Sequence, residues 1–590
     1  MERLRGNLPL LLIWLAVCAV LILVTRGQIM TGIGWDPDDQ LRMVQLRDWL
    51  GGQSWFDTTQ YRIGEPDSQP MHWPRWIELP LALVFLLLQP VLGAAGAETA
   101  AMVIVPLVTL GLAMWLTVKI AEPLFGRSIA LLAATLTATA VPVVAQIRPM
   151  RVDHHGWQIV LALTALWTMY WPERRKGGIA LGLALALWLS ISLEGLPLSA
   201  AFIVLLVWRW VFQTEEGVRL FWTLLSFLAA SFLFYFATQG GFDAVLNYCD
   251  ALSPAHLLAC TAGAAVMLPS IRWLPANRVL RLGSLAIAGA AALAVLYGMA
   301  PQCMGGAFNT MDPIVREYWL VNVLEGLPIW YQNGRTMVTL LGGSIIVGLI
   351  SLLYILRTRP AGMDRSRLFV LAYAFLWALL LSLFVQRATA VAAAFALPFM
   401  AWAVHQVFVR ARALKRPLSR ILATAAVVFL ILPGPLAVAL FNAVSDEEEP
   451  VAKSPESLAC RSNESLARLN SLPRSNILAP LDFGPRLLLL TPHSVLATSH
   501  HRNDRAMADQ IRILTSAPDR ARDLLEAHNI RYIIACDAEP ELALYAKKQP
   551  KGLWAQLVSG RKPEWLQPVH IRDNGLRIWR IVPKGLRNRM

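Results

Sequence analysis

Thirteen apolar segments, each long enough to cross a bilayer, constrain the fold of this 590-residue chain more than any other feature. Charged residues make up only 16% of the chain and hydrophobic residues 56%, which excludes an ordinary soluble protein. The sequence therefore predicts a polytopic α-helical membrane protein with about 13 transmembrane helices. The segments begin near Leu8, Thr99, Ser128, Trp157, Ile179, Leu198, Leu220, His256, Leu285, Met337, Leu368, Ala390 and Leu422.

The distribution of basic residues predicts the topology. A fourteenth apolar run, 79–92, is short and carries Gln89-Pro90 inside it. If this run does not span and the N-terminus is cytoplasmic, all strongly basic connections, such as 174–176 and 410–420, fall on the cytoplasmic side, as the positive-inside rule requires. We therefore expect 79–92 to be a re-entrant or surface-lying segment. The net charge of +14 is dispersed between apolar runs, which argues against a nucleic-acid partner.

This topology predicts two domains. A transmembrane domain covers 1–441, with a first external loop at about 28–96 and a fifth at about 301–335. After the acidic run 446–449 the composition becomes that of a soluble domain, so we predict an extracytoplasmic α/β domain over 442–590. Apolar patterns at 529–536 and 576–582 are typical of its strands. The expected location is the plasma (inner) membrane of a bacterium or archaeon.

The six cysteines include no Cys-x-x-Cys pair, which argues against a structural metal cage. Cys249 and Cys303 fall in loops expected outside the membrane, and Cys460 and Cys536 in the soluble domain. Disulfides within these two pairs and free thiols both remain open.

Two acidic motifs lie on the expected outer face. Asp36, Asp38 and Asp39 follow the first apolar segment, where they form either a solvated turn with Pro37 or a site for a hard cation. The second motif, Asp153-His154-His155, places a carboxylate and an imidazole where both can reach one ion.

Two lone ionisable residues belong to the same face. Glu325 lies near the end of the fifth external loop, and Arg387 is a single cation between two apolar segments. Arg387 is either an interfacial anchor or a binding group for an anion such as a lipid phosphate, and its place on the outer face favours the anion. Glu194, beside Gly195 and Pro197, either lines the same cavity or caps a helix end.

Together these motifs resemble those of the GT-C glycosyltransferase superfamily, in particular the catalytic subunit of archaeal and bacterial oligosaccharyltransferase. The sequence 36–42 resembles the first acidic motif of that family, and 153–155 resembles the second. The sequence 323–328 is similar to the glutamate motif of the fifth external loop, and Arg387 lies where the family keeps a lipid-phosphate arginine. The resemblance covers roughly residues 8–440.

The resemblance implies roles for these residues. Asp36, Asp153 and His155 would bind a divalent ion, Mn²⁺ or Mg²⁺, with Asp38, Asp39 and His154 as alternatives. Asp36 and Glu325 would be catalytic, Glu325 engaging the acceptor, and Arg387 would bind the phosphate of the donor.

The chain departs from the family at one motif. The Trp-Trp-Asp sequence that reads a peptide sequon is missing, and its nearest counterpart, 480–485, keeps only an Asp-aromatic-Gly core around Asp482. His500 and His501 follow as further acceptor-side residues or as a plain surface pair. Transfer to asparagine is therefore less favoured than transfer to another acceptor.

The resulting hypothesis is a membrane glycosyltransferase. It would move a sugar or oligosaccharide from a polyprenyl-phosphate or -diphosphate donor to an extracytoplasmic glycan, lipid or protein. The alternatives are a protein N-oligosaccharyltransferase, a transporter or flippase for lipid-linked glycans, and a non-catalytic assembly protein. Transporters usually place polar residues at the membrane midplane, whereas the ionisable groups here gather at one face.

Overall fold

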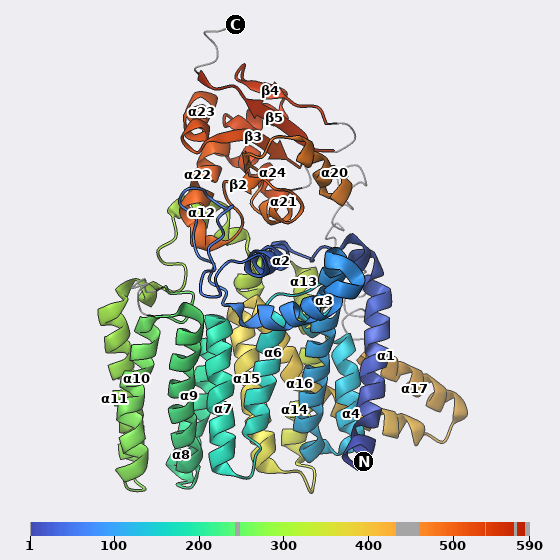
Figure 1. Cartoon of the computed structure of the whole chain (residues 1–590). Helices are drawn as coiled ribbons and strands as arrows, with labels where there is room; N and C mark the ends of the chain where they lie inside the picture. Colours follow the sequence, from blue (N-terminus) through green and yellow to red (C-terminus); the bar gives the residue numbers. More distant parts are fainter. Residues whose placement is uncertain (1, 242–247, 432–458, 537–538, 572–574, 585–590) are drawn as a thin grey trace. The chain divides into compact units, whose positions relative to one another are not determined.

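The computed structural model describes residues 2–241, 248–431, 459–536, 539–571 and 575–584 (Figure 1). The acidic run 446–449 lies outside the described residues. Within the described part, eight helices are long and apolar enough to cross a membrane, or nine if the bent pair α13 and α14 is one span. The chain is a multi-pass membrane protein. The eight helices are α1 (Glu2–Thr31), α3 (Glu78–Phe125), α8 (Leu196–Phe212), α9 (Glu216–Gln239), α10 (Pro254–Trp273), α11 (Arg278–Met299), α15 (Arg365–Phe384) and α16 (Thr389–Arg412).

Each of the other expected segments also falls in a helix, but these helices are shorter, broken or more charged. A helix of 14 residues extends about 21 Å, less than the hydrocarbon core of about 30 Å. The α7 helix opens on three basic residues, Arg174, Arg175 and Lys176. These helices are α4 (Arg127–Leu136), α6 (His155–Thr168), α7 (Arg174–Ile191), α13 (Gly334–Leu341), α14 (Ser344–Thr358) and α17 (Pro417–Ile431), and the short α5 (Val141–Gln146) lies between α4 and α6.

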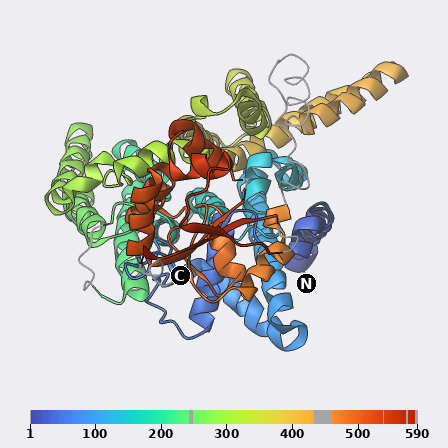
Figure 2. The same ribbon diagram turned by 90° about the horizontal axis from the view of Figure 1, so that it is seen from above.

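The ambiguous run 79–92 is helical and continues into the next apolar segment as part of α3. The helix breaks at Gly93, where φ is 70° and ψ is 173°, a conformation that favours glycine. Figure 1 shows the part of α3 before this break lying across the direction of the neighbouring helices. The last helix of this region, α17, projects away from the others in both views (Figures 1 and 2).

The chain folds into two compact units. The first, called the helical unit below, comprises Met1–Ile29, Leu79–Asn309 and Leu324–Glu447. The second, called the mixed unit, comprises Met30–Glu78, Thr310–Val323 and Glu448–Met590. Parts of the first and fifth predicted external loops therefore fold together with the C-terminal region.

Within the helical unit, α6, α7, α8 and α15 have two chemically different ends. A turn joins α7 to α8 at Glu194, and Arg387, just past α15, is ion-paired to that residue. At the opposite end one cavity is lined by the residues just after α6, by the end of α8 and by the first residues of α7, α9 and α15.

The mixed unit contains a five-stranded sheet in the order β2-β1-β3-β5-β4. The β1 strand is parallel to β2 and β3, whereas β5 is antiparallel to β3 and β4. The strands expected at 529–536 and 576–582 are β3 and β5. The strands are β1 (Asn476–Leu478), β2 (Ser494–Val495), β3 (Ile530–Ala535), β4 (Leu566–Pro568) and β5 (Arg577–Ile581), and the helices are α2 (Pro37–Leu50), α12 (Pro313–Tyr318), α20 (Asn463–Ala467), α21 (Gly484–Leu490), α22 (Asp504–Thr515), α23 (Pro518–Ala527), α24 (Pro540–Lys548) and α25 (Leu553–Val558).

Both cysteine pairs that the sequence left open are disulfides. Cys249 is bonded to Cys303 in the helical unit, and Cys460 is bonded to Cys536 in the mixed unit. Cys18 and Cys260 are free thiols.

Candidate functional site

A short loop between α5 and α6 positions the second acidic motif. In this loop Met150 has a φ of 71°, which few residues other than glycine adopt, and its N–H donates to the carbonyl of Met102 at 2.8 Å. This bond fixes the loop against α3. Asp153 and His154 follow, and His155 begins α6.

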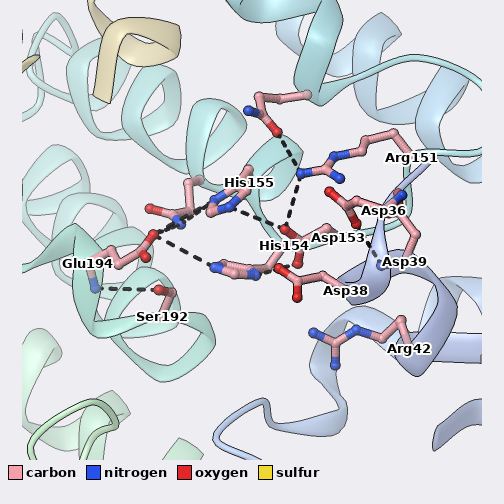
Figure 3. A network of polar contacts seen from close by, with 12 residues as sticks. Asp36, Asp38, Asp39, Arg42, Arg151, Asp153, His154, His155, Ser192 and Glu194 are labelled. Carbon is pink, nitrogen blue, oxygen red and sulfur yellow. Dashed lines mark hydrogen bonds and ion pairs between the residues drawn. The ribbon is translucent and has the colours of Figure 1, made fainter. Parts of the chain in front are cut away.

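The two histidines approach different oxygens of Asp153 (Figure 3). His154 Nδ1 lies 2.5 Å from Asp153 Oδ1, and His155 Nε2 lies 3.2 Å from Asp153 Oδ2. Arg151 Nη2 is 3.6 Å from Oδ2. All three members of the motif are buried.

These contacts set the charges of Asp153 and His154. Burial alone would raise the pKa of the Asp153 carboxyl, but the two histidines and Arg151 hold it well below its ordinary value. Burial alone would lower the pKa of His154, but the Asp153 carboxylate and Glu194 raise it to about 9. His154 is therefore protonated near neutral pH and donates to Asp153, which leaves His155 as the imidazole suited to ligate a metal.

Glu194 connects this motif to α7 and α8. It lies in the turn Leu193–Gly195, and its Oε2 is 3.8 Å from His154 Nε2 and 3.7 Å from His155 Nδ1. Gln158 Nε2 donates to the same oxygen at 2.9 Å, and Trp188 Nε1 donates to Gln158 Oε1 at 3.3 Å. We call Asp153, His154, His155 and Glu194 the acid–histidine cluster.

Arg387 joins the cluster to Glu325. Its Nη1 lies 2.5 Å from Glu194 Oε1, and its Nη2 lies 3.1 Å from Glu325 Oε1. A backbone bond from Gln386 N to the carbonyl of Leu327, 3.0 Å long, holds the two turns together. The helical unit therefore brings together four of the predicted site residues, namely Asp153, His155, Glu325 and Arg387, although they are far apart in sequence.

The cluster has the chemistry of a divalent-cation site. One ligand atom from each of Asp153, His154 and His155 lies within 4.8 Å of the others. His155 Nε2 is buried and makes no hydrogen bond within the described part of the chain. It lies 3.2 Å from Asp153 Oδ2, close to the separation of about 3 Å between adjacent ligands of an octahedral ion. These residues fit a metal.

The first acidic motif lies in the mixed unit and forms a helix cap. Asp36 is the N-cap of α2, where its Oδ1 accepts from Asp39 N at 3.0 Å. Asp39 Oδ2 accepts in return from the N–H groups of Asp36 and Trp35, at 3.3 and 3.0 Å. Both carboxylates thus stabilise the start of α2. That Asp36 shares an ion with Asp153 and His155 stays a prediction.

Three further expected residues meet within the mixed unit. His500 Nε2 lies 3.1 Å from Asp38 Oδ1, and burial together with the nearby Asp38 carboxylate raises the pKa of the Asp482 carboxyl. His500 is buried, so it is not a surface residue. Its ring meets the Trp73 ring edge-on, with 5.1 Å between the ring centroids. The ring of His501 packs on the ring of His72, with 4.5 Å between the ring centroids.

The sequence did not predict two residues of the site clearly: Glu194 was ambiguous, and Gln158 was not predicted at all. Glu194 was ambiguous because a glutamate beside Gly195 is also a common helix end, yet it contacts both histidines and Arg387. Gln158 carries no charge in an apolar helix, and no motif marked it. Its position three residues after His155, on the same helix face, was the available signal.

At the sequence level, neither a protein-family profile nor a curated protein matches the chain. Its structure is similar to that of the oligosaccharyltransferase AglB from Archaeoglobus fulgidus in complex with an inhibitory peptide and a dolichol-phosphate. The TM-score is 0.63 at 14% identity, over 88% of this chain and 69% of that one.

The structure of the Archaeoglobus fulgidus oligosaccharyltransferase in complex with Zn and sulfate also matches, with a TM-score of 0.56 at 14% identity, over 89% of this chain and 67% of that one. ArnT from Cupriavidus metallidurans bound to undecaprenyl phosphate matches over 96% of this chain and 97% of its own, at 12% identity and a TM-score of 0.46. The match to AglB shows that the chain has a GT-C fold, as the motif resemblance predicted.

Proposed function

We propose that the chain is a metal-assisted GT-C glycosyltransferase that uses a polyprenyl-phosphate or -diphosphate sugar donor. The observation that carries this proposal is the connected set of charges in the helical unit, from Asp153 and His155 through Glu194 to Arg387 and Glu325. Ionisable groups at a membrane edge are costly, so an interconnected set of them, in which Asp153 and His155 are buried, points to function.

Each residue of this set has a role in the proposal. Asp153 and His155, with Asp36 of the first motif, hold a Mn²⁺ or Mg²⁺ ion, and His154 keeps Asp153 ionised and oriented. Arg387 binds the donor phosphate, exchanging one of its carboxylate partners for the lipid. Glu325 orients the acceptor or takes its proton. The bound ion would neutralise charge on the departing polyprenyl phosphate.

The fold match supports this choice among the alternatives. AglB is an oligosaccharyltransferase and was solved with a dolichol-phosphate, which makes a lipid-phosphate donor the natural proposal here. An oligosaccharyltransferase structure from the same organism was solved with Zn, which supports a divalent ion. The missing Trp-Trp-Asp motif favours an acceptor other than asparagine. The proposed site faces the extracytoplasmic side of the plasma (inner) membrane.

A purified-protein assay tests the proposal. The full chain is incubated with the lipid extract of its own host and its acceptor-bearing envelope fraction, and release of polyprenyl phosphate is followed by mass spectrometry. We expect release that stops on chelation and returns with Mn²⁺. Absence of release by the folded wild type would reject the enzyme assignment.

Asp36→Asn separates catalysis from helix capping. Asparagine caps a helix about as well as aspartate, so this substitution should leave stability within about 0.5 kcal/mol. It removes the charge that a metal ligand needs, so release should fall about 100-fold or more. The matched control Asp67→Asn changes an exposed acid of the same region and should keep wild-type release. Wild-type release by Asp36→Asn would leave Asp36 with the capping role alone.

A further inference from the structure

The opposite end of the same helices holds a cavity lined by four arginines. Its volume is about 180 Å³, well above the roughly 10–15 Å³ that a single water requires. Arg174, Arg209, Arg219 and Arg367 line it together with Glu216 and Asp364. Two positive charges are therefore in excess. We call this site the arginine cavity.

Two of the four arginines already make short hydrogen bonds within the protein. Arg219 donates to the carbonyls of Thr168 and Trp171 at 3.1 and 2.7 Å and to Glu216 at 3.1 Å. Arg174 Nε donates to the other oxygen of Glu216 at 3.0 Å. Glu216 is almost fully buried and fixes this part of the lining.

Within the described residues, the guanidinium groups of the other two arginines make only long polar contacts. Arg209 Nη2 lies 3.5 Å from Ser366 Oγ and 3.6 Å from Glu216 Oε1, and Arg367 Nη1 lies 3.5 Å from Asp364 Oδ2. Charge-assisted hydrogen bonds are typically about 2.7–2.9 Å long. Arg209 and Arg367 therefore retain the capacity to bind an anion in the cavity.

We propose that the arginine cavity binds a phosphate group, either that of an anionic phospholipid headgroup or a free phosphate. The cavity lies at the ends of membrane helices, beside Tyr170 and Trp171, aromatic types that concentrate at the membrane interface where lipid phosphates lie. A guanidinium pair matches the geometry of phosphate oxygens. The site is separate from the proposed donor site, because it lies at the other end of α6, α7, α8 and α15.

Native mass spectrometry of the purified full chain tests this site. The probes are phosphatidylglycerol, phosphatidylcholine and inorganic phosphate. We expect the wild type to bind phosphatidylglycerol at least about tenfold more tightly than phosphatidylcholine. The variant Arg209→Gln/Arg367→Gln should lose about tenfold or more of that affinity, because two cations near the headgroup are removed.

The control Arg357→Gln/Arg412→Gln removes two exposed arginines at the ends of α14 and α16. It should keep wild-type affinity within about twofold. A second variant, Ser366→Asp, keeps all four arginines but places a carboxylate beside Arg209, so it should also lose the preference for phosphatidylglycerol.

A wild-type response to phosphatidylglycerol alone identifies a lipid headgroup, and an equal response to inorganic phosphate identifies a free phosphate as the ligand. In both cases the phosphate site stands if the cavity variants lose the response. Retention of the preference in both cavity variants, or an equal loss in the control, overturns the proposal.

Discussion

The two ends of the α6, α7, α8 and α15 helices differ in the kind of charge that they bury. One end holds the acid–histidine cluster, in which Asp153 and Glu194 face two histidines and the guanidinium groups of Arg151 and Arg387. The other end holds the arginine cavity, in which four arginines surround two acids. The topology of a membrane protein already calls for arginines at one end of its helices. Topology gives no reason for a buried carboxylate, Asp153, beside two buried histidines at the other end, so that end carries the proposed chemistry.

Asp153→Asn should produce the largest effect. The substitution keeps the size of the side chain but removes the charge that pairs with His154 and that a metal ligand requires. We expect glycan transfer to fall about 1000-fold or more, the effect of losing several kcal/mol of charge stabilisation. The protein should still fold, as judged by thermal unfolding in detergent. Full transfer by a folded Asp153→Asn protein would remove the functional contrast between the two ends.

Glu216→Gln probes the arginine end in the same way. It leaves the buried Arg219 without its carboxylate partner, and such a loss typically lowers the free energy of unfolding by about 3 kcal/mol. The neighbouring control Glu215→Gln changes a largely exposed acid and should cost less than about 0.5 kcal/mol. Denaturant unfolding of both variants measures the difference, and equal stabilities would show that Glu216 does not organise the cavity.

Arg387→Ala sharpens the comparison at the acid–histidine end. The variant removes the guanidinium that pairs with both Glu194 and Glu325, so the affinity for a polyprenyl-phosphate probe should fall about 10- to 100-fold. Arg387→Lys should recover only part of the affinity, because lysine lacks the planar pair of donors. Equilibrium binding of the probe lipid measures this effect. Unchanged affinity in Arg387→Ala would return the residue to the role of an interfacial anchor.

Gln158→Leu should give the smallest effect. Leucine cannot donate to Glu194 or accept from Trp188, so Glu194 and the buried Trp188 each lose a partner. We expect the free energy of unfolding to fall by about 1–2 kcal/mol. A thermal shift assay checks the direction, and an unchanged midpoint would show that Gln158 does not support the cluster.

Much of the helical unit could be predicted from the sequence because a bilayer imposes simple rules. Each apolar segment is helical, and the charged residues between segments indicate which ends lie together. The break at Gly93 could not be predicted, since an apolar run with an interior glycine also fits one long span. The assembly of Met30–Glu78 with the C-terminal region depends on packing between distant segments, which apolar periodicity does not report.

The site was predictable where a residue is unusual for its surroundings. Asp153, His155, Glu325 and Arg387 stood out as ionisable groups among apolar segments, and the structure brings these four together. Gln158 did not stand out, because its role depends on a partner 36 residues away. The capping role of Asp36 was readable from Asp-Pro-x-Asp, a pattern typical of a helix start, but the acidic motif was interpreted for its chemistry alone.

Mass analysis of lipid-linked glycans in a strain that lacks this chain tests the central claim most directly. The account predicts that one polyprenyl-phosphate-linked glycan accumulates and that its product disappears from the envelope. The wild-type chain should reverse both changes, and Asp153→Asn should reverse neither. An unchanged lipid-linked pool and an unchanged envelope would contradict the proposed transfer reaction.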